Sequence, residues 1–166
     1  TLDEARKFLD TDEDLSDAIT RASARIRALM QNPVIYETAT DVLHGGSYKL
    51  ILSYYPIVDG TVTVTDIETG KTIMPDFINK SAGILERRSR WEHGHRRWEV
   101  SYSAGLAETV DDVPQDIKAA TLLLVQEEAG EEFLQSEGIG DYSFRRFNDM
   151  SIMSRVKQLI APYVRR

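Results

Sequence analysis

Four groups of residues in this chain have types and spacings that could do chemistry, and the first is Gly70-Lys71-Thr72. These residues match the end of a phosphate-binding loop. The full motif also needs a glycine five residues before Gly70, where this chain has Thr65, and a helix directly after the loop. Pro75 prevents such a helix. The sequence therefore predicts a solvated hairpin turn here.

The second group is His93 and His95, which could share a metal ion. Zinc sites use three or four protein ligands, and Glu92 does not complete a recognisable ligand spacing. Gly94, between the two histidines, favours a turn. We therefore expect a turn without a metal at this position, and we assign no role to His44.

The third group consists of paired carboxylates at helical spacing. Acid–base catalysis needs a pocket that moves the pKa values of two such groups apart. These glutamates fall at the polar end of a predicted helix, so a solvated face is expected. The chain also has no cysteine, no Ser-His-Asp order and no Gly-x-Ser-x-Gly motif, so we predict that it is not an enzyme and binds no cofactor. The residues of this group are Glu127, Glu128, Glu131 and Glu132.

The fourth group combines arginine with tryptophan between residues 87 and 98. Basic residues interleaved with aromatic ones are typical of nucleic-acid surfaces, but the net charge of −7 argues against a general phosphate-binding surface. Arg and Trp are also enriched at protein–protein hot spots. We therefore favour a protein interface and keep a DNA-binding accessory protein as the alternative. The predicted interface residues are Arg87, Arg88, Arg90, Trp91, Arg96, Arg97 and Trp98.

Charged residues are unevenly distributed along the chain. Residues 3–17 and 108–137 are acidic, whereas residues 87–97 and 155–166 are basic. Copies of such a chain can bring unlike charges face to face. The pattern is a reason for self-association.

The clearest element is a helix predicted over residues 113–136. Pro114 suits the first turn of a helix, because its missing N–H would have no partner there. The helix is apolar almost all round from Ile117 to Val125, so other elements must cover it. Helices are also predicted within residues 1–32, where an apolar stripe of helical period runs from Leu15 to Met30.

Residues 34–105 have the character of β-strands. Apolar and polar residues alternate at 48–53 and again at 61–65, and Gly45-Gly46 has the composition of a hairpin turn. Large apolar residues are few in this region. We therefore expect the β module to rely on the helices or on a neighbouring subunit for its core.

A last amphipathic helix is predicted over residues 151–166, after a linker at residues 137–150. Its apolar side either completes the helical core or docks into a groove of a partner protein, and both interpretations stay open. The residues on this side are Ile152, Met153, Val156, Leu159, Ile160 and Tyr163.

These elements predict an α+β fold that is mainly α: a small helical bundle with an inserted β-hairpin module and a C-terminal helical extension. Its core would span residues 1–136, as helices at 1–32, the β module at 34–105 and the long helix at 113–136. A chain of 166 residues suffices for one domain. No apolar run approaches the ~20 residues needed to cross a membrane, and no secretory leader is seen.

The order of these elements resembles the head–tail connector proteins of long-tailed bacteriophages, also called adaptor or head-completion proteins. The match spans nearly the whole chain. Its most specific segments are Gly83-Ile84-Leu85, residues 98–105 (Trp-Glu-Val-Ser-Tyr-Ser-Ala-Gly) and residues 113–120 (Val-Pro-Gln-Asp-Ile-Lys-Ala-Ala). The opening helices at 2–26, the segments at 54–58 and 62–66, and Leu159-Ile-Ala-Pro-Tyr163 also look like that family.

The resemblance implies a ring, commonly of twelve subunits, beneath the portal protein in the neck of the virion, after assembly in the host cytoplasm. DNA passes through such a ring without sequence-specific binding, and a stopper or tail completion protein docks below it. The family is non-enzymatic and carries no cofactor.

We expect the arginine–tryptophan cluster to meet a neighbouring subunit or the portal, and residues 152–163 to dock into the portal. Two other classes stay open. One is the DNA-binding accessory protein, and the other is a small hydrolase or metal enzyme built on His93, His95 and the glutamates.

Overall fold

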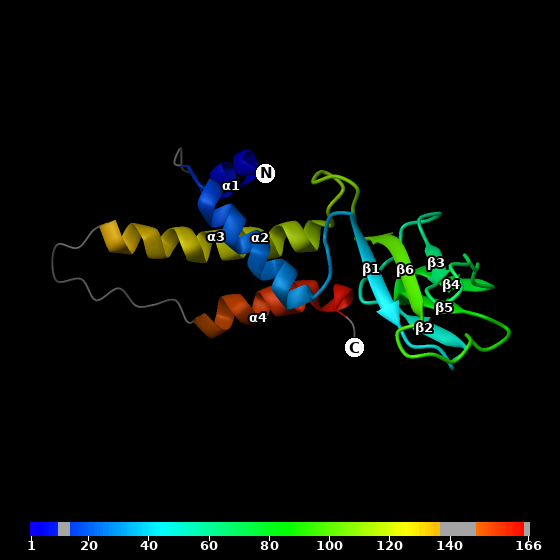
Figure 1. The fold of residues 1–166 in the computed structure, drawn as a ribbon. Coiled ribbons are helices and arrows are strands. Elements are labelled where there is room, and N and C mark those ends of the chain that lie inside the picture. Colours follow the sequence, from blue (N-terminus) through cyan, green and yellow to red (C-terminus); the bar gives the residue numbers. More distant parts are fainter. Residues whose placement is uncertain (10–13, 137–148, 165–166) are drawn as a thin grey trace. The chain divides into compact units, whose positions relative to one another are not determined.

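The computed structural model describes residues 1–9, 14–136 and 149–164, with the side chains of 130–151 left out of the description. The chain forms two compact units. We call Thr1–Gln31 with Pro114–Arg166 the helical unit, and Asn32–Val113 the β unit. Figure 1 labels their elements. No helix in the described part of the chain is both long enough and apolar enough to cross a membrane.

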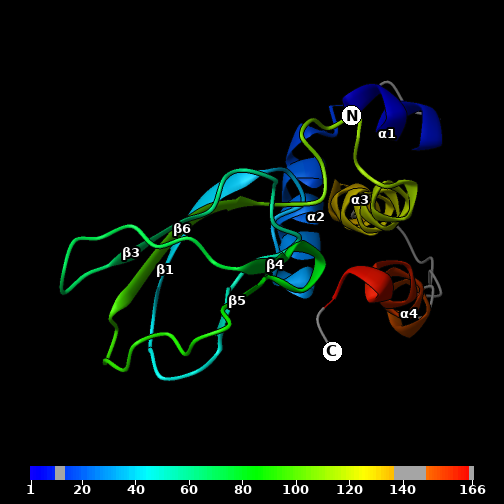
Figure 2. The same ribbon diagram turned by 90° about the vertical axis from the view of Figure 1, so that its right-hand side faces the viewer.

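The helical unit is built around its longest helix. It contains α1 (Leu2–Leu9), α2 (Ser16–Met30), α3 (Gln115–Ser136), α4 (Asp149–Ile160) and the short 3₁₀ helix η2 (Ala161–Tyr163). Figures 1 and 2 show α3 in the middle, with α1, α2 and α4 around it. The helix predicted over residues 113–136 corresponds to α3, which begins at Gln115 and ends at Ser136.

The surroundings of α3 explain its apolar composition. Ile117, Ala120 and Leu124 are buried, and Leu122 and Leu123 are half-buried. The expected complete cover is not reached, because Ala119 is exposed. The other elements contribute the following buried residues to this core: Ala5, Leu15, Ala18, Ala22, Ile26, Met30, Val156 and Ile160.

The β unit contains two three-stranded antiparallel sheets. The first has the order β1 (Glu37–Leu43), β6 (Trp98–Ala104), β3 (Thr63–Asp66). The second has the order β2 (Lys49–Ile51), β5 (Ile84–Glu86), β4 (Phe77–Asn79), with the 3₁₀ helix η1 (Lys80–Ala82) after β4. In the first sheet Leu43 pairs with Trp98, and Asp66 pairs with Trp98 from the other side.

The two faces of β6 have different roles. Trp98, Val100 and Tyr102 are buried on one face. On the other face, Ser101 and Ser103 meet threonine hydroxyls of β1 at oxygen–oxygen distances of 3.1 and 3.3 Å. The inner residues join a core formed by Leu50, Leu52, Ile57, Val64, Leu85, Trp91 and Ala104.

The prediction of a mainly α fold with a small β-hairpin module is wrong. Two sheets with their own hydrophobic core occupy residues 32–113, rather than a hairpin that relies on the helices. The reason lies in Trp91, Trp98 and Tyr102, whose large buried side chains supply the core volume that we expected the helices or a neighbouring subunit to provide. The predicted domain limits at 136 and 150 stay untested, since residues 137–148 of the predicted linker lie outside the described residues.

Replacing Leu124 by alanine should destabilise the helical unit. Its side chain is fully buried in α3, and truncation of a buried leucine costs about 2–5 kcal/mol. Helices α1–α4 belong to the helical unit and both tryptophans to the β unit, so circular dichroism and tryptophan fluorescence report on different units. In urea, Leu124→Ala should lower the unfolding midpoint seen by circular dichroism and leave the fluorescence midpoint in place.

Gln126→Ala, on the exposed side of α3, is the control. Equal circular-dichroism midpoints for Leu124→Ala and the wild type would contradict this packing.

Candidate assembly interface

Residues 87–97, which we call the arginine loop, connect β5 to β6 and have a fixed shape. The backbone N–H groups of Gly45 and Gly46 donate to the carbonyls of Gly94 and Trp91 at 3.0 and 2.7 Å. A Cβ atom at Gly45 would lie 1.7 Å from the carbonyl oxygen of Glu92, so only glycine fits there. The arginine loop is therefore held against the segment that follows β1.

Both tryptophans of the predicted interface lie in the core of the β unit. Trp91 and Trp98 are fully buried, and their rings meet edge to face with centroids 5.0 Å apart. The Trp98 Nε1–H donates to the carbonyl of Glu92 at 3.1 Å. These two side chains pack in the core beneath the arginine loop, and their burial makes them unavailable to a partner.

Arg97 is also committed to the fold. Its guanidinium binds the Asp66 carboxylate with two hydrogen bonds, Nε to Oδ1 at 3.0 Å and Nη2 to Oδ2 at 2.8 Å. It also pairs with Glu68 at 3.1 Å and with Glu92. The hydrogen bonds from Arg97 hold the pKa of Asp66 at about 2, below its ordinary value of 3.8, and the pKa of Arg97 is raised in turn.

The other four arginines of the cluster lie at the surface. Arg88, Arg90 and Arg96 are exposed, and Arg87 is half-buried with its guanidinium carbon 5.1 Å from the centre of the Trp91 ring. Among the residues that the structure describes, none of the four has a carboxylate within ion-pair distance, in contrast to Arg97. The arginine loop thus carries positive charge that no ion pair with a described carboxylate neutralises.

Exposed apolar side chains on the β2–β5–β4 sheet were not predicted from the sequence. On the outer face of the β2–β5–β4 sheet, Ile51 is 57% exposed and Phe77 is 59% exposed, while Leu50 and Leu85 fill the inner face. A strand with apolar residues on both faces is typical of a sheet that is covered on both sides. The run Lys49-Leu50-Ile51 carries this signal, because apolar residues occupy two successive positions.

The histidines form a second support of the arginine loop. The rings of His44 and His95 lie with their centroids 4.5 Å apart, and His44 Nδ1 accepts a hydrogen bond from the backbone N–H of Arg96 at 3.1 Å. The described residues contain no group of three histidine or acidic side chains that could hold a metal ion. His44, for which the sequence predicts no role, thus fixes the backbone of Arg96.

The other candidate groups are parts of the fold. Gly70-Lys71-Thr72 lies in a turn after β3, where the Asp66 N–H donates to the carbonyl of Lys71 at 2.9 Å, and the predicted hairpin turn is confirmed. Glu127 and Glu128 pair with Arg25 and Arg21 of α2 at 3.1 and 3.0 Å. The side chains of the other two glutamates, Glu131 and Glu132, lie outside the described residues.

The predicted docking helix is α4, and it packs against α3 within the helical unit. Val156 and Ile160 are buried in this contact. The rest of its predicted apolar side stays half-buried and consists of Ile152, Met153, Leu159 and Tyr163.

A family match covers almost the whole chain. The model of the head completion protein family matches residues 4–166. The chain belongs to this family. Head completion proteins are a structural family and not a family of enzymes. No curated protein sequence matches the chain.

Solved structures of gene transfer agent (GTA) particles contain chains with a similar fold. In the neck of the native particle, computed with C12 symmetry, one chain has a TM-score of 0.60 at 16% identity, over 93% of this chain and 86% of its own length. A chain in the virion of the native particle has a TM-score of 0.60 at 13% identity, over 87% and 75% of the two chains. In the neck of the empty particle, computed with C6 symmetry, one chain has a TM-score of 0.58 at 14% identity, over 87% of this chain and 76% of its own length.

Replacing Asp66 by asparagine should remove an acid-dependent part of the stability of the β unit. The pKa of Asp66 is lower in the folded chain than its ordinary value of 3.8, so its contribution is complete above that pH and is lost as the pH falls toward about 2. The wild-type urea midpoint, followed by tryptophan fluorescence, should fall across this window. The urea midpoint of Asp66→Asn should be lower than that of the wild type at neutral pH, and it should fall less steeply as the pH decreases. Glu108→Gln, an exposed site of the same unit, controls for the change of net charge. A slope for Asp66→Asn as steep as that of the wild type would refute this role of the ion pair.

Proposed function

We propose that this protein is a head–tail adaptor in the neck of a tailed phage or of a phage-like particle, where it joins the capsid to the tail. The observation that carries the proposal is the family match over residues 4–166. The similar fold of chains from the GTA neck supports it.

The adaptor acts as a ring of identical subunits, which we take to be twelve. The C12 and C6 symmetries of the GTA neck structures are compatible with such a ring. A ring needs heterologous contacts, in which two different surfaces of one subunit meet those of its two neighbours. The unneutralised arginines Arg87, Arg88, Arg90 and Arg96 are suited to one of these surfaces, against a neighbour or against the portal protein.

The partners of the ring are the portal protein on one side and a stopper or tail completion protein on the other, with DNA passing through the channel. We assign α4 to the portal contact. Its half-buried residues Met153 and Leu159 keep apolar surface for a partner, while Val156 and Ile160 attach the helix to α3. The protein has no catalytic role and needs no cofactor, in keeping with its structural family.

A DNA-binding accessory protein is the second candidate, and the four surface arginines favour it. The net charge of −7 opposes it, since affinity for DNA comes mainly from positive charges that neutralise phosphates. The two functions therefore differ in what the arginines bind.

Charge reversal at Arg88, Arg90 and Arg96 should prevent ring assembly. Glutamates at these exposed positions would repel the surface that the arginines contact. The triple Glu variant and the wild type are compared by native mass spectrometry, alone and mixed with the portal protein, and Lys71→Glu in the exposed turn is the control. We expect the ring only for the wild type and the control. Unchanged assembly of the triple variant, together with wild-type binding to duplex DNA that weakens steeply with salt, would favour the DNA-binding alternative.

Removing the chain after Phe147 should abolish binding to the portal. Because this truncation also uncovers α3, a milder variant is needed, and Met153→Gln with Leu159→Gln leaves the buried contacts of Val156 and Ile160 in place. Both variants should lose portal binding in a pull-down assay, and the double variant should keep its circular dichroism. Arg155→Gln, on the exposed side of α4, is the control. Retained portal binding by both variants would exclude α4 as the docking element.

A further inference from the structure

We propose that the arginine loop of one subunit binds the acidic loop at residues 108–112 of the next subunit in the ring. The proposal rests on the proposed ring and names the contact that closes it. We call the receiving site the arginine surface, and it consists of Tyr48, Phe77, Arg87, Arg88 and Arg90. Its occupant is a second copy of this chain.

The arginine surface lies at the ends of strands β2, β4 and β5. The N–H of Arg87 donates to the carbonyl of Tyr48, next to β2, at 3.0 Å. The N–H of Arg88 donates to Asp76 Oδ2, next to β4, at 2.8 Å. Two exposed aromatic residues lie in this region, since the Tyr48 ring contacts Arg90 and Phe77 follows Asp76 and pairs with Glu86. Phe77 is 59% exposed and Tyr48 is 49% exposed.

The charges within the arginine surface leave it positive. The Arg90 guanidinium carbon lies 5.3 Å from the centre of the Tyr48 ring, so this side chain is directed along the surface. Two carboxylates also lie here, but Glu86 is paired with Lys49 at 3.1 Å, and the single charge of Asp76 offsets only one of the three arginines. The complementary ligand is an acidic segment that carries an apolar side chain.

The acidic loop has this composition. Its sequence is Glu-Thr-Val-Asp-Asp, all five residues are exposed, and Val110 is 53% exposed between carboxylates on both sides. The loop is also a built turn, since the N–H of Asp112 donates to the carbonyl of Thr109 at 3.2 Å and the Thr109 hydroxyl donates to Asp112 Oδ2 at 2.6 Å. It can therefore bind with little loss of conformational entropy.

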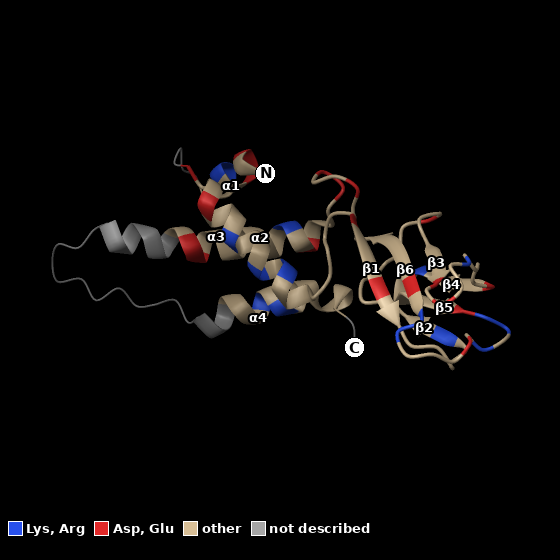
Figure 3. Cartoon of the chain, in the orientation of Figure 1, with Lys and Arg blue, Asp and Glu red and all other residues tan. Residues whose placement is uncertain are grey.

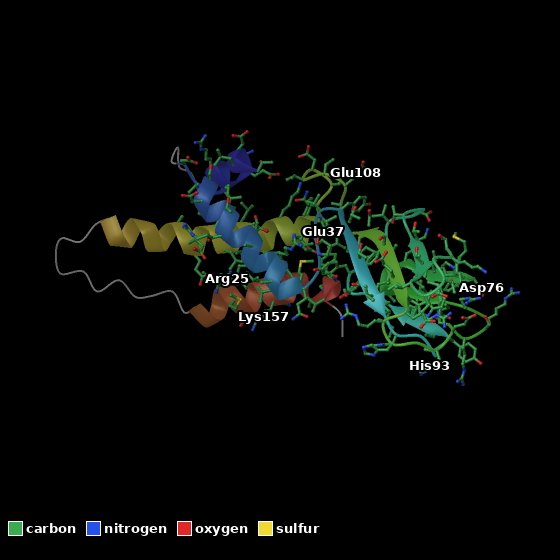
Figure 4. All side chains as sticks on the ribbon, in the orientation of Figure 1. Arg25, Glu37, Asp76, His93, Glu108 and Lys157 are labelled. Carbon is green, nitrogen blue, oxygen red and sulfur yellow. The ribbon has the colours of Figure 1, made fainter. Side chains whose placement is uncertain are left out.

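One subunit cannot join these two sites to each other. The arginine loop precedes β6 and the acidic loop follows it, and the seven residues of this strand span about 20 Å. Figure 3 shows basic residues on the arginine loop and acidic residues on the loop at the other end of β6. Figure 4 shows Glu108 far from Asp76 and His93, which lie at the arginine end of the unit.

A contact between two different ends of identical copies propagates from subunit to subunit, and it closes into a ring when the rotation per step allows it. The arginine surface and the acidic loop also have opposite charge, which favours this pairing over contacts between like ends. The two sites thus meet the requirement for heterologous contacts that the proposed ring sets.

The test exchanges the charges of the two sites. A surface variant carries Arg88→Glu and Arg90→Glu, and a loop variant carries Glu108→Arg and Asp111→Arg. Each variant alone presents two sites of the same sign, so neither should form the ring that the wild type forms. An equal mixture should restore it, because every contact then joins unlike charges, and the ring should contain both variants in equal amounts by native mass spectrometry. Lys71→Glu is the control and should assemble as the wild type does.

The outcomes separate this inference from the proposed function. Circular dichroism and tryptophan fluorescence first establish that both variants are folded. Ring formation by either variant alone, or no ring in the mixture of folded variants, would overturn the contact and leave the adaptor function standing. No ring for the wild type, with or without the portal protein, would overturn the adaptor function together with the contact.

Discussion

The bidentate ion pair between Arg97 and Asp66 is the constraint on which the surface of the β unit depends. It joins the end of the arginine loop to the last residue of β3, and both side chains are largely buried. A buried ion pair stabilises a fold only where good geometry and further hydrogen bonds offset the cost of desolvation. Asp66 meets this condition, because it also accepts from the Thr69 hydroxyl and the Glu68 N–H. The loop is thereby fixed in one shape.

This anchoring divides a single run of basic and aromatic residues into two classes. One class lies inside the β unit, where Trp91 and Trp98 are buried and Arg97 is paired with Asp66. The other class lies at the surface, where Arg88 and Arg90 have no carboxylate partner among the described residues. Preorganised charges of this kind lose little entropy on binding. In the proposed contact, the fixed backbone of the arginine loop therefore limits the entropy that is lost when Arg88 and Arg90 bind a partner.

The helices could be predicted from the sequence and the sheets only in part, for a physical reason. The period of apolar residues fixes the buried side of α2 from local sequence alone, and the Pro114 start marks α3. Strand pairing is non-local, so nothing in the residues near β6 indicates that it pairs with both β1 and β3. The same limit affects the interface. The composition around Trp91 and Trp98 suggested an exposed hot spot, whereas their burial depends on β-unit contacts that a linear sequence does not reveal.

The strength of the proposed contact also bears on when a ring can form. Exposed ion pairs contribute only about 0.2–1 kcal/mol each and are screened by salt, so one contact between two subunits is weak. A ring converts the last association into an intramolecular step, and docking onto a portal raises the effective concentration of neighbouring subunits. The net charge of −7 adds repulsion between free copies. Subunits joined by the arginine surface and the acidic loop should therefore form the ring at lower protein concentration where a template brings them together than when they are free in solution.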